Sequence, residues 1–247
     1  MNLSNRVALL VGARRMGLAV ATALASHGAD VALTYRSAPD AADAAADAVR
    51  ALGRRAMVVR CDVTDEVPLV EATFQQVVEA MGRLDVLVVM ASFYQAVPFD
   101  ELDAFAIERQ LGVDMRGTFV CMRAALPHMR AAGGGRIITF SDWTAASSRP
   151  RYKGYTGYYV AKAGVKALTE AFALELAGDQ ILVNAIAPGP VLPPEDFSPD
   201  QRAGVEAATP LGRWGGADEV AKAVLALVDS DFMTGETIRV DGGRHLR

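Results

Sequence analysis

Cysteine and histidine are both scarce in this chain of 247 residues. The two cysteines, Cys61 and Cys121, cannot supply the several disulfides that hold small secreted domains together, so we expect buried, reduced thiols. The three histidines, His27, His128 and His245, stand far apart and have no metal-ligand pattern beside them. We therefore expect no metal site.

Long hydrophobic runs and an excess of one charge are absent as well. The apolar run at residues 86–91 is far shorter than the ~20 residues that a membrane-spanning helix needs. The first residues do not have the pattern of a signal peptide, so we expect a cytoplasmic protein with no membrane partner. The 25 Lys and Arg residues nearly balance the 29 Asp and Glu residues, which argues against a nucleic-acid partner that contacts the whole surface.

Short aliphatic segments alternate with longer alanine-rich segments along the chain. Continuous apolar strands that alternate with helices are typical of a parallel sheet covered on both faces. The pattern predicts one α/β domain over residues 1–247, a doubly wound, parallel seven-stranded sheet with helices on both faces, which is the Rossmann fold. The clearest helix is expected at 41–52. The predicted strands are residues 7–11, 31–35, 56–60, 86–90, 137–140, 182–186 and 237–240.

Two irregular segments, residues 142–157 and 188–216, follow predicted strands. Doubly wound sheets bind their ligands outside the carboxyl ends of the strands. These two segments are therefore the predicted active-site loops.

A glycine-containing turn follows the first predicted strand, with the sequence Gly12-Ala13-Arg14-Arg15-Met16-Gly17. Glycines there let the backbone approach a pyrophosphate, whose charge the next helix N-terminus stabilises. An acidic residue after the second strand would select NAD, but this chain has Arg36, followed by Ser37. We predict that Arg14, Arg15 and Arg36 bind a 2′-phosphate, so that the cofactor is NADPH. The alternative is a plain turn with solvated surface arginines.

Tyr158 and Lys162 are four residues apart in a segment of helical pattern, so they share one helix face. An ammonium ~5 Å from a phenol supplies ~3 kcal/mol in favour of the phenolate at an effective dielectric of ~20. The spacing thus predicts acid–base chemistry, although such a pair also occurs by chance. Tyr155 and Tyr159 are alternative tyrosines.

Together these motifs resemble the short-chain dehydrogenase/reductase family over nearly the whole chain. The resemblance depends on the glycine turn, Cys61-Asp62-Val63, Tyr158-x-x-x-Lys162, Asn184-x-x-x-Pro188-Gly189, and the run from Thr234-Gly235 to Asp241-Gly242-Gly243. It implies that Tyr158 is the proton donor, that Lys162 holds the nicotinamide ribose and lowers the tyrosine pKa, and that the protein is a homotetramer. The implied cofactor-binding residues are Gly12, Arg14, Arg15, Met16, Gly17, Arg36, Ser37, Asp62, Val63, Ala91, Tyr158, Lys162, Pro188 and Gly189.

Several positions depart from the family pattern. Arg15 replaces the middle glycine of the turn, Asp114 replaces a helix asparagine, and Ala145 stands where a serine is expected thirteen residues before the tyrosine. These departures leave catalysis either rearranged or lost.

Arg15, the run Ala91-Ser92-Phe93-Tyr94 and Asp142 are similar to features of pteridine and dihydromonapterin reductases. This resemblance implies NADPH-dependent reduction of a C=N bond in a dihydropterin, with Phe93 or Tyr94 stacked on the ring. The implied catalytic residues are Tyr158, Lys162, Asp142 and Asp114, and the implied substrate contacts are Arg15, Ser92, Phe93, Tyr94, Asp142 and Tyr158. The alternatives are a carbonyl reductase for 3-oxoacyl thioesters or ketones, and a non-catalytic NADP(H)-binding protein. Asp142 could also be only a helix cap, and Phe93 and Tyr94 only packing residues.

Overall fold

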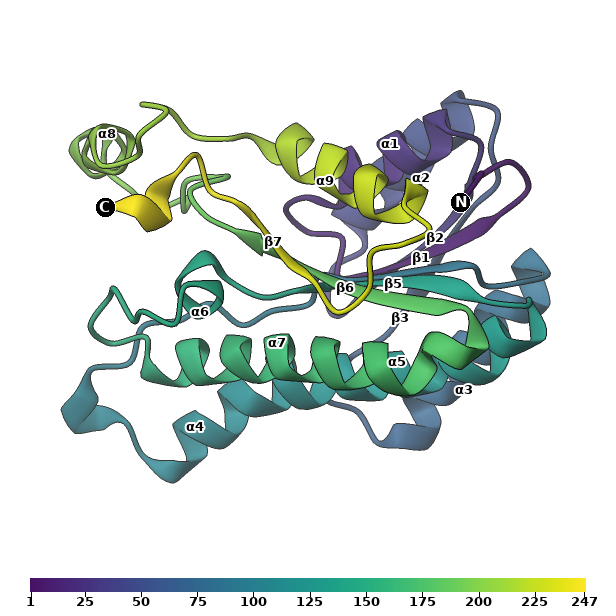
Figure 1. The fold of residues 1–247 in the computed structure, drawn as a ribbon, viewed down its shortest axis with the longest axis horizontal. Coiled ribbons are helices and arrows are strands. Elements are labelled where there is room, and N and C mark those ends of the chain that lie inside the picture. The colour runs from purple at the N-terminus through teal and green to yellow at the C-terminus, as the bar shows by residue number, and fades with distance from the viewer.

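Seven parallel strands form one sheet in the computed structural model, which describes residues 1–247 (Figure 1). Their order across the sheet is β3-β2-β1-β4-β5-β6-β7, and this confirms the predicted doubly wound fold. The strands are β1(Val7–Val11), β2(Asp30–Tyr35), β3(Ala56–Arg60), β4(Val86–Val89), β5(Gly135–Phe140), β6(Ile181–Pro188) and β7(Thr237–Val240). Each lies within two residues of its predicted bounds.

Two layers of helices cover the sheet. Helices α1(Gly17–Ser26), α2(Asp40–Ala51) and α9(Ala217–Asp229) lie on one face, and α3(Val67–Met81), α5(Gly117–Ala131) and α7(Thr156–Leu176) lie on the other (Figure 1). The shorter helices are α4(Ala104–Leu111), α6(Trp143–Ala146) and α8(Pro199–Ala207), with a π-helical turn η2(Gly112–Arg116) and 3-10 turns η1(Phe99–Glu101), η3(Ala177–Asp179) and η4(Arg244–Leu246).

The two faces of the sheet bury two separate apolar cores. In β1, Ala8 and Leu10 pack toward α1, α2 and α9, whereas Val7, Leu9 and Val11 pack toward α3, α5 and α7. Successive side chains of a strand point to opposite faces, so a strand covered on both sides is apolar at every position. This explains why the strands are uninterrupted aliphatic runs in the sequence.

Both cysteines are free and buried, as predicted. Burial raises the pKa of the Cys61 thiol to about 11 and that of Cys121 well above its usual value. Both thiols therefore stay protonated and act as small apolar side chains. No helix combines the length and the apolar character needed to cross a membrane.

A buried carboxylate fixes the amino-terminal edge of the sheet. Asp85, just before β4, is fully buried and accepts hydrogen bonds from Arg6 at 2.8 Å, from Arg83 at 2.7 and 2.6 Å, and from the backbone N–H of Val7 at 2.9 Å. Both arginines pair with a carboxylate that no water reaches, so they depend on it for compensation.

We expect Asp85→Ala to lower the free energy of unfolding by about 1–3 kcal/mol, because it leaves the buried N–H of Val7 without its acceptor and two partly exposed arginines without their partner. Urea denaturation followed by circular dichroism measures this loss. Asp47→Ala is the matched control, since Asp47 forms an exposed ion pair with Arg50 at 2.8 Å and should cost less than about 1 kcal/mol. Equal losses in the two variants would contradict the role of Asp85.

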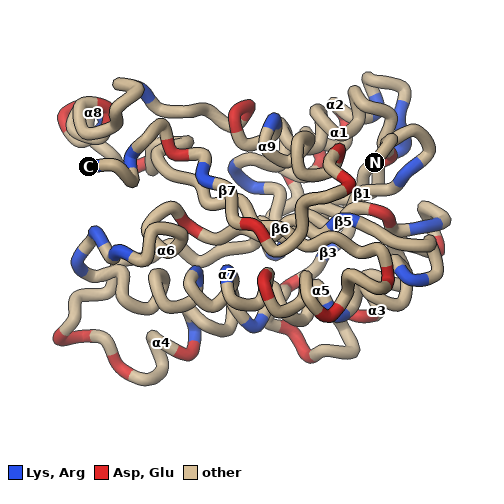
Figure 2. The backbone as a smooth tube through the Cα atoms, in the orientation of Figure 1, with Lys and Arg blue, Asp and Glu red and all other residues tan.

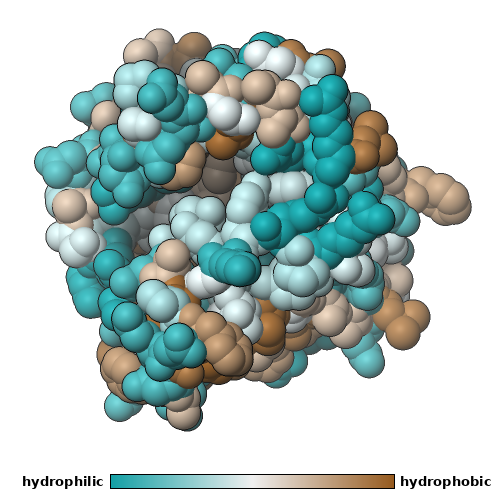
Figure 3. Space-filling view, turned by 90° about the vertical axis from the view of Figure 1, so that its left-hand side faces the viewer, coloured by the Kyte–Doolittle hydropathy of each residue, from teal (hydrophilic) through white to brown (hydrophobic).

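The strand order reverses between β1 and β4, which are neighbours although β2 and β3 lie between them in sequence. A doubly wound sheet opens a ligand-binding crevice at such a point, beyond the carboxyl ends of the strands. Both predicted active-site loops begin at the same edge of the sheet, at the carboxyl ends of β5 and β6. Figure 3 shows this end of the molecule, which is hollowed and largely rimmed by hydrophilic residues.

Candidate active site

The turn after β1 approaches the end of β4 so closely that no side chain fits between them. Gly12 has φ +88°, and a Cβ on it would lie 2.7 Å from the backbone N of Ala91. Gly17, the first residue of α1, has the same constraint, since its Cβ would lie 2.8 Å from that of Ala13. The Gly12 N–H donates to the Thr34 hydroxyl at 3.2 Å, and the tight turn leads into the N-terminus of α1, an arrangement that suits the pyrophosphate of a dinucleotide.

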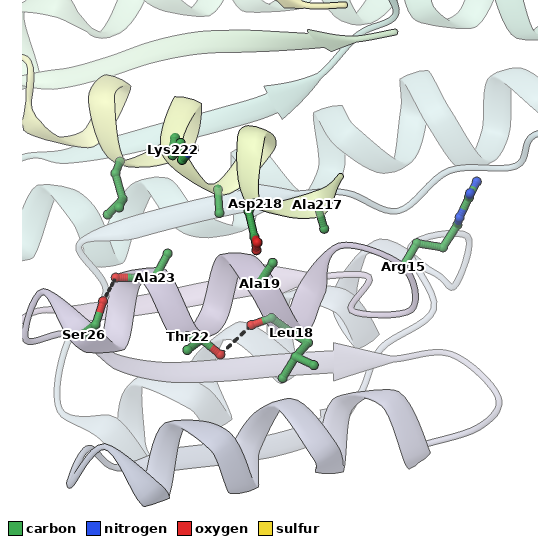
Figure 4. A pocket seen from close by; sticks show the side chains of 11 residues that line it. Arg15, Leu18, Ala19, Thr22, Ala23, Ser26, Ala217, Asp218 and Lys222 are labelled. Atoms are coloured by element: carbon green, nitrogen blue, oxygen red, sulfur yellow. Dashed lines mark hydrogen bonds between the residues drawn. The ribbon is translucent and has the colours of Figure 1, made fainter. Parts of the chain in front are cut away.

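The three arginines predicted to bind a 2′-phosphate do not converge. Arg15 donates to the carbonyls of Leu192 and Pro193 at 2.7 and 3.1 Å, and Arg14 lies 3.8 Å from Glu195. Both side chains thus contact the loop after β6, and Figure 4 shows Arg15 extending beyond the N-terminal end of α1. Only Arg36, exposed just after β2, has a guanidinium without a protein partner. Local sequence could not show that a distant loop offers carbonyls to the turn.

The predicted adenine-binding residues lie at the start of the loop after β3. The Asp62 carboxylate accepts from the backbone N–H of Thr64 at 2.9 Å and from its hydroxyl at 2.7 Å. Val63 is buried against Gly117, where a Cβ would lie 2.6 Å from a Val63 methyl group. The role of both residues in cofactor binding stays a prediction, as it does for Met16, Ser37, Pro188 and Gly189.

The hydroxyl of Tyr158, on α7, donates to the Asp142 carboxylate at 3.4 Å. Asp142 follows β5 and caps α6, where its other oxygen accepts from the backbone N–H of Thr144 at 2.8 Å and from its hydroxyl at 2.5 Å. A fixed separation of thirteen residues pointed to Ala145, but Ala145 is buried within α6 and Asp142 occupies the place beside the tyrosine. The longer loop between α6 and α7 explains the difference.

Asp142 is therefore a helix cap and a neighbour of Tyr158 at once. The two interpretations of this residue are not exclusive, because a carboxylate has two oxygens that accept independently. One oxygen holds the N-terminus of α6, and the other is left for the phenol.

Lys162 forms a buried ion pair with Asp114. Its ammonium lies 2.9 Å from the Asp114 carboxylate and donates to the carbonyl of Phe140 at 2.8 Å. Asp114 is fully buried in the π-helical turn η2 and also accepts from the Ser92 hydroxyl at 2.5 Å, the Phe93 N–H at 3.0 Å and the Gln110 amide at 2.8 Å. Four donors thus compensate a carboxylate that no water reaches.

Gln110 was not singled out in the sequence, although it lies four residues before Asp114 and so shares its helix face. Its amide also donates to the carbonyl of Phe93. The π-helical turn brings Gln110 and Asp114 onto the segment that follows β4. A chain of polar contacts therefore connects that segment to the lysine on α7.

Burial and the Asp142 and Asp114 carboxylates raise the pKa of the Tyr158 phenol well above its usual value. This direction is opposite to the expected one. The ammonium of Lys162 lies 5.6 Å from the centroid of the phenol ring, but its charge is compensated by Asp114. Burial also raises the pKa of the Asp142 carboxyl, against the hydrogen bonds from Thr144. The phenol therefore stays neutral, which is the state that a proton donor requires.

Aromatic side chains surround the phenol. Tyr94 stacks on Tyr155 with centroids 4.7 Å apart and meets the ring of Tyr158 edge-on at 4.9 Å. Phe93 points elsewhere, since the guanidinium of Arg109 covers its ring at 4.3 Å. Of the two aromatic residues predicted to stack on a substrate, only Tyr94 lines the site. Tyr155, considered above only as an alternative tyrosine, is its stacking partner.

No group of three or more His, Cys, Asp or Glu side chains is arranged to hold a metal ion.

A dinucleotide turn at the reversal of strand order, with a tyrosine and a lysine beside it, defines a nicotinamide-dependent oxidoreductase of the Rossmann class. The chain belongs to the short-chain dehydrogenase/reductase family. Residues 12–245 match the family model described as enoyl-(acyl carrier protein) reductase. Enzymes of this family are oxidoreductases that act on small molecules with a nicotinamide cofactor.

Similar proteins span the whole chain. It is 38% identical over 246 residues to the cis-4-hydroxycyclohexanecarboxylate dehydrogenase of Sinomonas cyclohexanicum, covering 97% of this chain and 96% of that protein. A short-chain dehydrogenase/reductase from Serratia marcescens superposes with a TM-score of 0.90 at 32% identity, over 99% of this chain and 100% of that one. Carveol dehydrogenase from Mycobacterium avium, solved in complex with NAD, gives a TM-score of 0.90 at 28% identity, covering 100% of this chain and 99% of that one.

Proposed function

We propose that this protein is an NADPH-dependent carbonyl reductase that interconverts a ketone and a secondary alcohol on a ring-shaped substrate, with Tyr158 as the proton donor. The observation that carries the proposal is the neutral phenol of Tyr158 held against Asp142 at the carboxyl edge of the sheet. A carbonyl oxygen that accepts a hydride on its carbon needs a proton, and a neutral phenol beside it supplies one.

The bound nicotinamide would supply the hydride, and the residues of this chain do the rest. Tyr158 gives its proton to the carbonyl oxygen, which becomes the alcohol hydroxyl. Asp142, whose carboxyl is 3.4 Å from that phenol, orients the hydroxyl and can return a proton to it. Lys162, held by Asp114, would bind the nicotinamide ribose.

The aromatic side chains beside Tyr158 favour a substrate that contains a ring. Tyr94 and Tyr155 present a stacked pair next to the phenol of Tyr158, and such faces bind flat or ring-shaped apolar groups. The relative from Sinomonas cyclohexanicum is named for a hydroxylated cyclohexane substrate, which is of this shape.

NADPH is the proposed cofactor because Arg36 stands after β2, where the ribose of the adenosine is recognised. We expect Arg36→Asp to lower kcat/KM for NADPH by about tenfold to a hundredfold, since charge-assisted hydrogen bonds are worth about 1.5–3 kcal/mol. The same substitution should raise kcat/KM for NADH, because a carboxylate accepts a hydrogen bond from a ribose 2′-hydroxyl. Steady-state kinetics with both cofactors measures the ratio.

Arg123→Asp is the control for this charge reversal. Arg123 is also exposed and unpaired, but it lies on α5, across the sheet from Arg36. An unchanged preference in Arg36→Asp, or an equal change in the control, would contradict selection by Arg36.

A substrate panel tests the proposed function. Purified protein is supplied with NADPH and, in separate reactions, with cyclohexanone derivatives, a 3-oxoacyl thioester and a 7,8-dihydropterin, and cofactor oxidation is followed. We expect turnover of the ring ketones to exceed that of the thioester. Cofactor binding with no turnover of any compound would instead indicate a non-catalytic NADP(H)-binding protein.

A dihydropterin reductase is the second candidate. It is favoured by Asp142, a carboxyl beside the tyrosine where the family usually has a hydroxyl, since burial raises its pKa and so favours the protonated form that a proton donor needs. Arg15 and Phe93, which were expected to contact the pterin, are engaged with the loop after β6 and with Arg109. Faster turnover of the dihydropterin than of every ketone would establish this candidate.

The assembly and the cellular location are predictions as well. We expect a homotetramer in the cytoplasm. Sedimentation velocity of the purified protein measures the number of subunits.

A further inference from the structure

Positive charge without acidic partners gathers next to Asp142 and Tyr158. No Asp or Glu occurs between Asp142 and Glu170, and the loop after α6 carries three Lys or Arg residues. Figure 2 shows these positions in blue with no red among them. The C-terminal turn η4 packs against α6 and brings a further arginine, Arg244, to the same place.

Two of these arginines converge on one indole. The guanidinium carbon of Arg151 lies 5.8 Å from the ring centroid of Trp143, and that of Arg244 lies 5.9 Å from it. Trp143 is buried and is the residue directly after Asp142. A guanidinium held near an aromatic ring at this distance keeps its N–H groups available for a ligand.

The nearby carboxylates are engaged with other donors. Asp241, close to Arg244 in sequence, accepts from the backbone N–H of Gly243 at 3.0 Å and from the ring of His245 at 2.7 Å. Asp142 accepts from Thr144 and Tyr158. Neither Arg151 nor Arg244 forms an ion pair.

The Nε of Arg244 is buried and has no hydrogen-bond acceptor. A buried guanidinium N–H without an acceptor is costly, and two cations that share one ring repel each other. An anion would give the buried Nε of Arg244 the acceptor that it lacks. Arg151, exposed and without an ion-pair partner near the same indole, offers a second donor group for such a ligand.

We propose that Arg151 and Arg244 bind a carboxylate of the substrate, at the end of the molecule remote from the carbon that Tyr158 serves. The inference rests on the proposed function and narrows its substrate class to anionic ring ketones and their alcohols. A guanidinium fork matches the two oxygens of a carboxylate.

A row of aromatic rings connects Trp143 to Tyr158. The ring centroids of Trp143 and Tyr152 are 6.2 Å apart, those of Tyr152 and Tyr155 are 6.2 Å apart, and those of Tyr155 and Tyr158 are 6.4 Å apart. These rings offer apolar faces to a substrate ring on the phenol side of the two arginines.

Matched substrates test the proposal by kinetics. We compare kcat/KM for 4-oxocyclohexanecarboxylate with that for its methyl ester, which has the same ring without the charge. The wild-type protein should prefer the acid by about tenfold or more. Arg151→Gln and Arg244→Gln should each reduce this preference, and the double variant should abolish it, so that acid and ester then have the same kcat/KM.

Arg149→Gln is the control, because it removes the same charge from an exposed position of the same loop and should leave the preference intact. Equal kcat/KM for acid and ester in the wild-type protein, or a preference that survives in the double variant, would overturn the proposal.

A binding measurement keeps the inference separate from the proposed function. Trp214→Phe leaves Trp143 as the only indole, because the chain has two tryptophans. Its fluorescence is titrated with cyclohexanecarboxylate and with the neutral cyclohexanecarboxamide. We expect a saturable change with the carboxylate alone, which is lost when Arg151→Gln and Arg244→Gln are added.

The two measurements distinguish the failures. If no ketone is turned over but the carboxylate binds through the two arginines, the proposed function is wrong and the anion site is correct. If ketones are reduced but carboxylate and carboxamide give the same titration, the anion site is wrong and the proposed function is correct.

Discussion

Tyr158→Phe should reduce kcat for ketone reduction by about 10²–10⁴-fold, the range that a general acid contributes. The substitution removes one hydroxyl from a partly buried ring and leaves Lys162 and its partner Asp114 in place. The affinity for NADPH should therefore stay nearly unchanged. Stopped-flow or steady-state kinetics of ketone reduction measure kcat, and fluorescence titration with NADPH measures the cofactor affinity.

Tyr159→Phe is the matched control, since it makes the same chemical change at the next residue of α7 and should keep wild-type kcat. A Tyr158→Phe protein that reduces ketones at more than about a tenth of the wild-type rate would show that another group, with Asp142 the nearest carboxyl, is the acid.

Asp114→Asn should move the pH dependence of the enzyme toward lower pH. Reduction requires the protonated phenol, so its rate falls as pH rises through the Tyr158 pKa. In the wild-type protein burial and two carboxylates hold that pKa well above its usual value, and reduction should not decline up to about pH 10. Without Asp114, the unpaired Lys162 ammonium, 5.6 Å from the ring centroid, favours the phenolate by about 3 kcal/mol, or about two pKa units.

The rate of alcohol oxidation has the opposite pH dependence, because oxidation requires the phenolate to accept a proton. At a fixed pH below the pKa of Tyr158, Asp114→Asn should therefore speed alcohol oxidation while the alkaline limit of ketone reduction moves down. Rate profiles in both directions measure the shift, and ultraviolet titration of the tyrosine gives it without turnover.

Loss of a buried ion-pair partner also costs about 3–5 kcal/mol of stability, so the folded state of the Asp114→Asn variant is checked by circular dichroism. Asp103→Asn is its control, since Asp103 caps α4 by accepting from the N–H of Ala106 at 2.8 Å and lies outside the cluster. A pH profile of Asp114→Asn that coincides with that of the control would mean that Asp114 serves stability alone.

Features that depend on neighbours in sequence could be predicted. The uninterrupted aliphatic segments indicated the strands, because parallel strands are buried on both faces. The spacing of Tyr158 and Lys162 placed them on one face of α7, because helical periodicity is local. Gly12 and Gly17 indicated a tight turn after β1, and the structure leaves no room for a Cβ at either position.

Features that depend on partners from distant segments could be predicted only in part. The family resemblance suggested Asp142 as a partner of Tyr158, whereas the count of thirteen residues led to Ala145, and only the packing of α6 on the sheet shows that Asp142 meets the phenol. Sequence order grouped Arg14 and Arg15 with Arg36, but the loop after β6 lies beside the first two and engages them.

The sequence by itself thus determined the fold, the crevice at the carboxyl edge and the tyrosine–lysine pair, because each follows from local periodicity. The tertiary structure alone decided the direction of the pKa shift of Tyr158. Lys162 faces Tyr158 in any such helix, but only the packing of η2 against α7 compensates the lysine charge with Asp114, and burial beside two carboxylates raises the pKa of the phenol. The strength and sign of an electrostatic effect depend on distance and burial in three dimensions, which the order of residues does not contain.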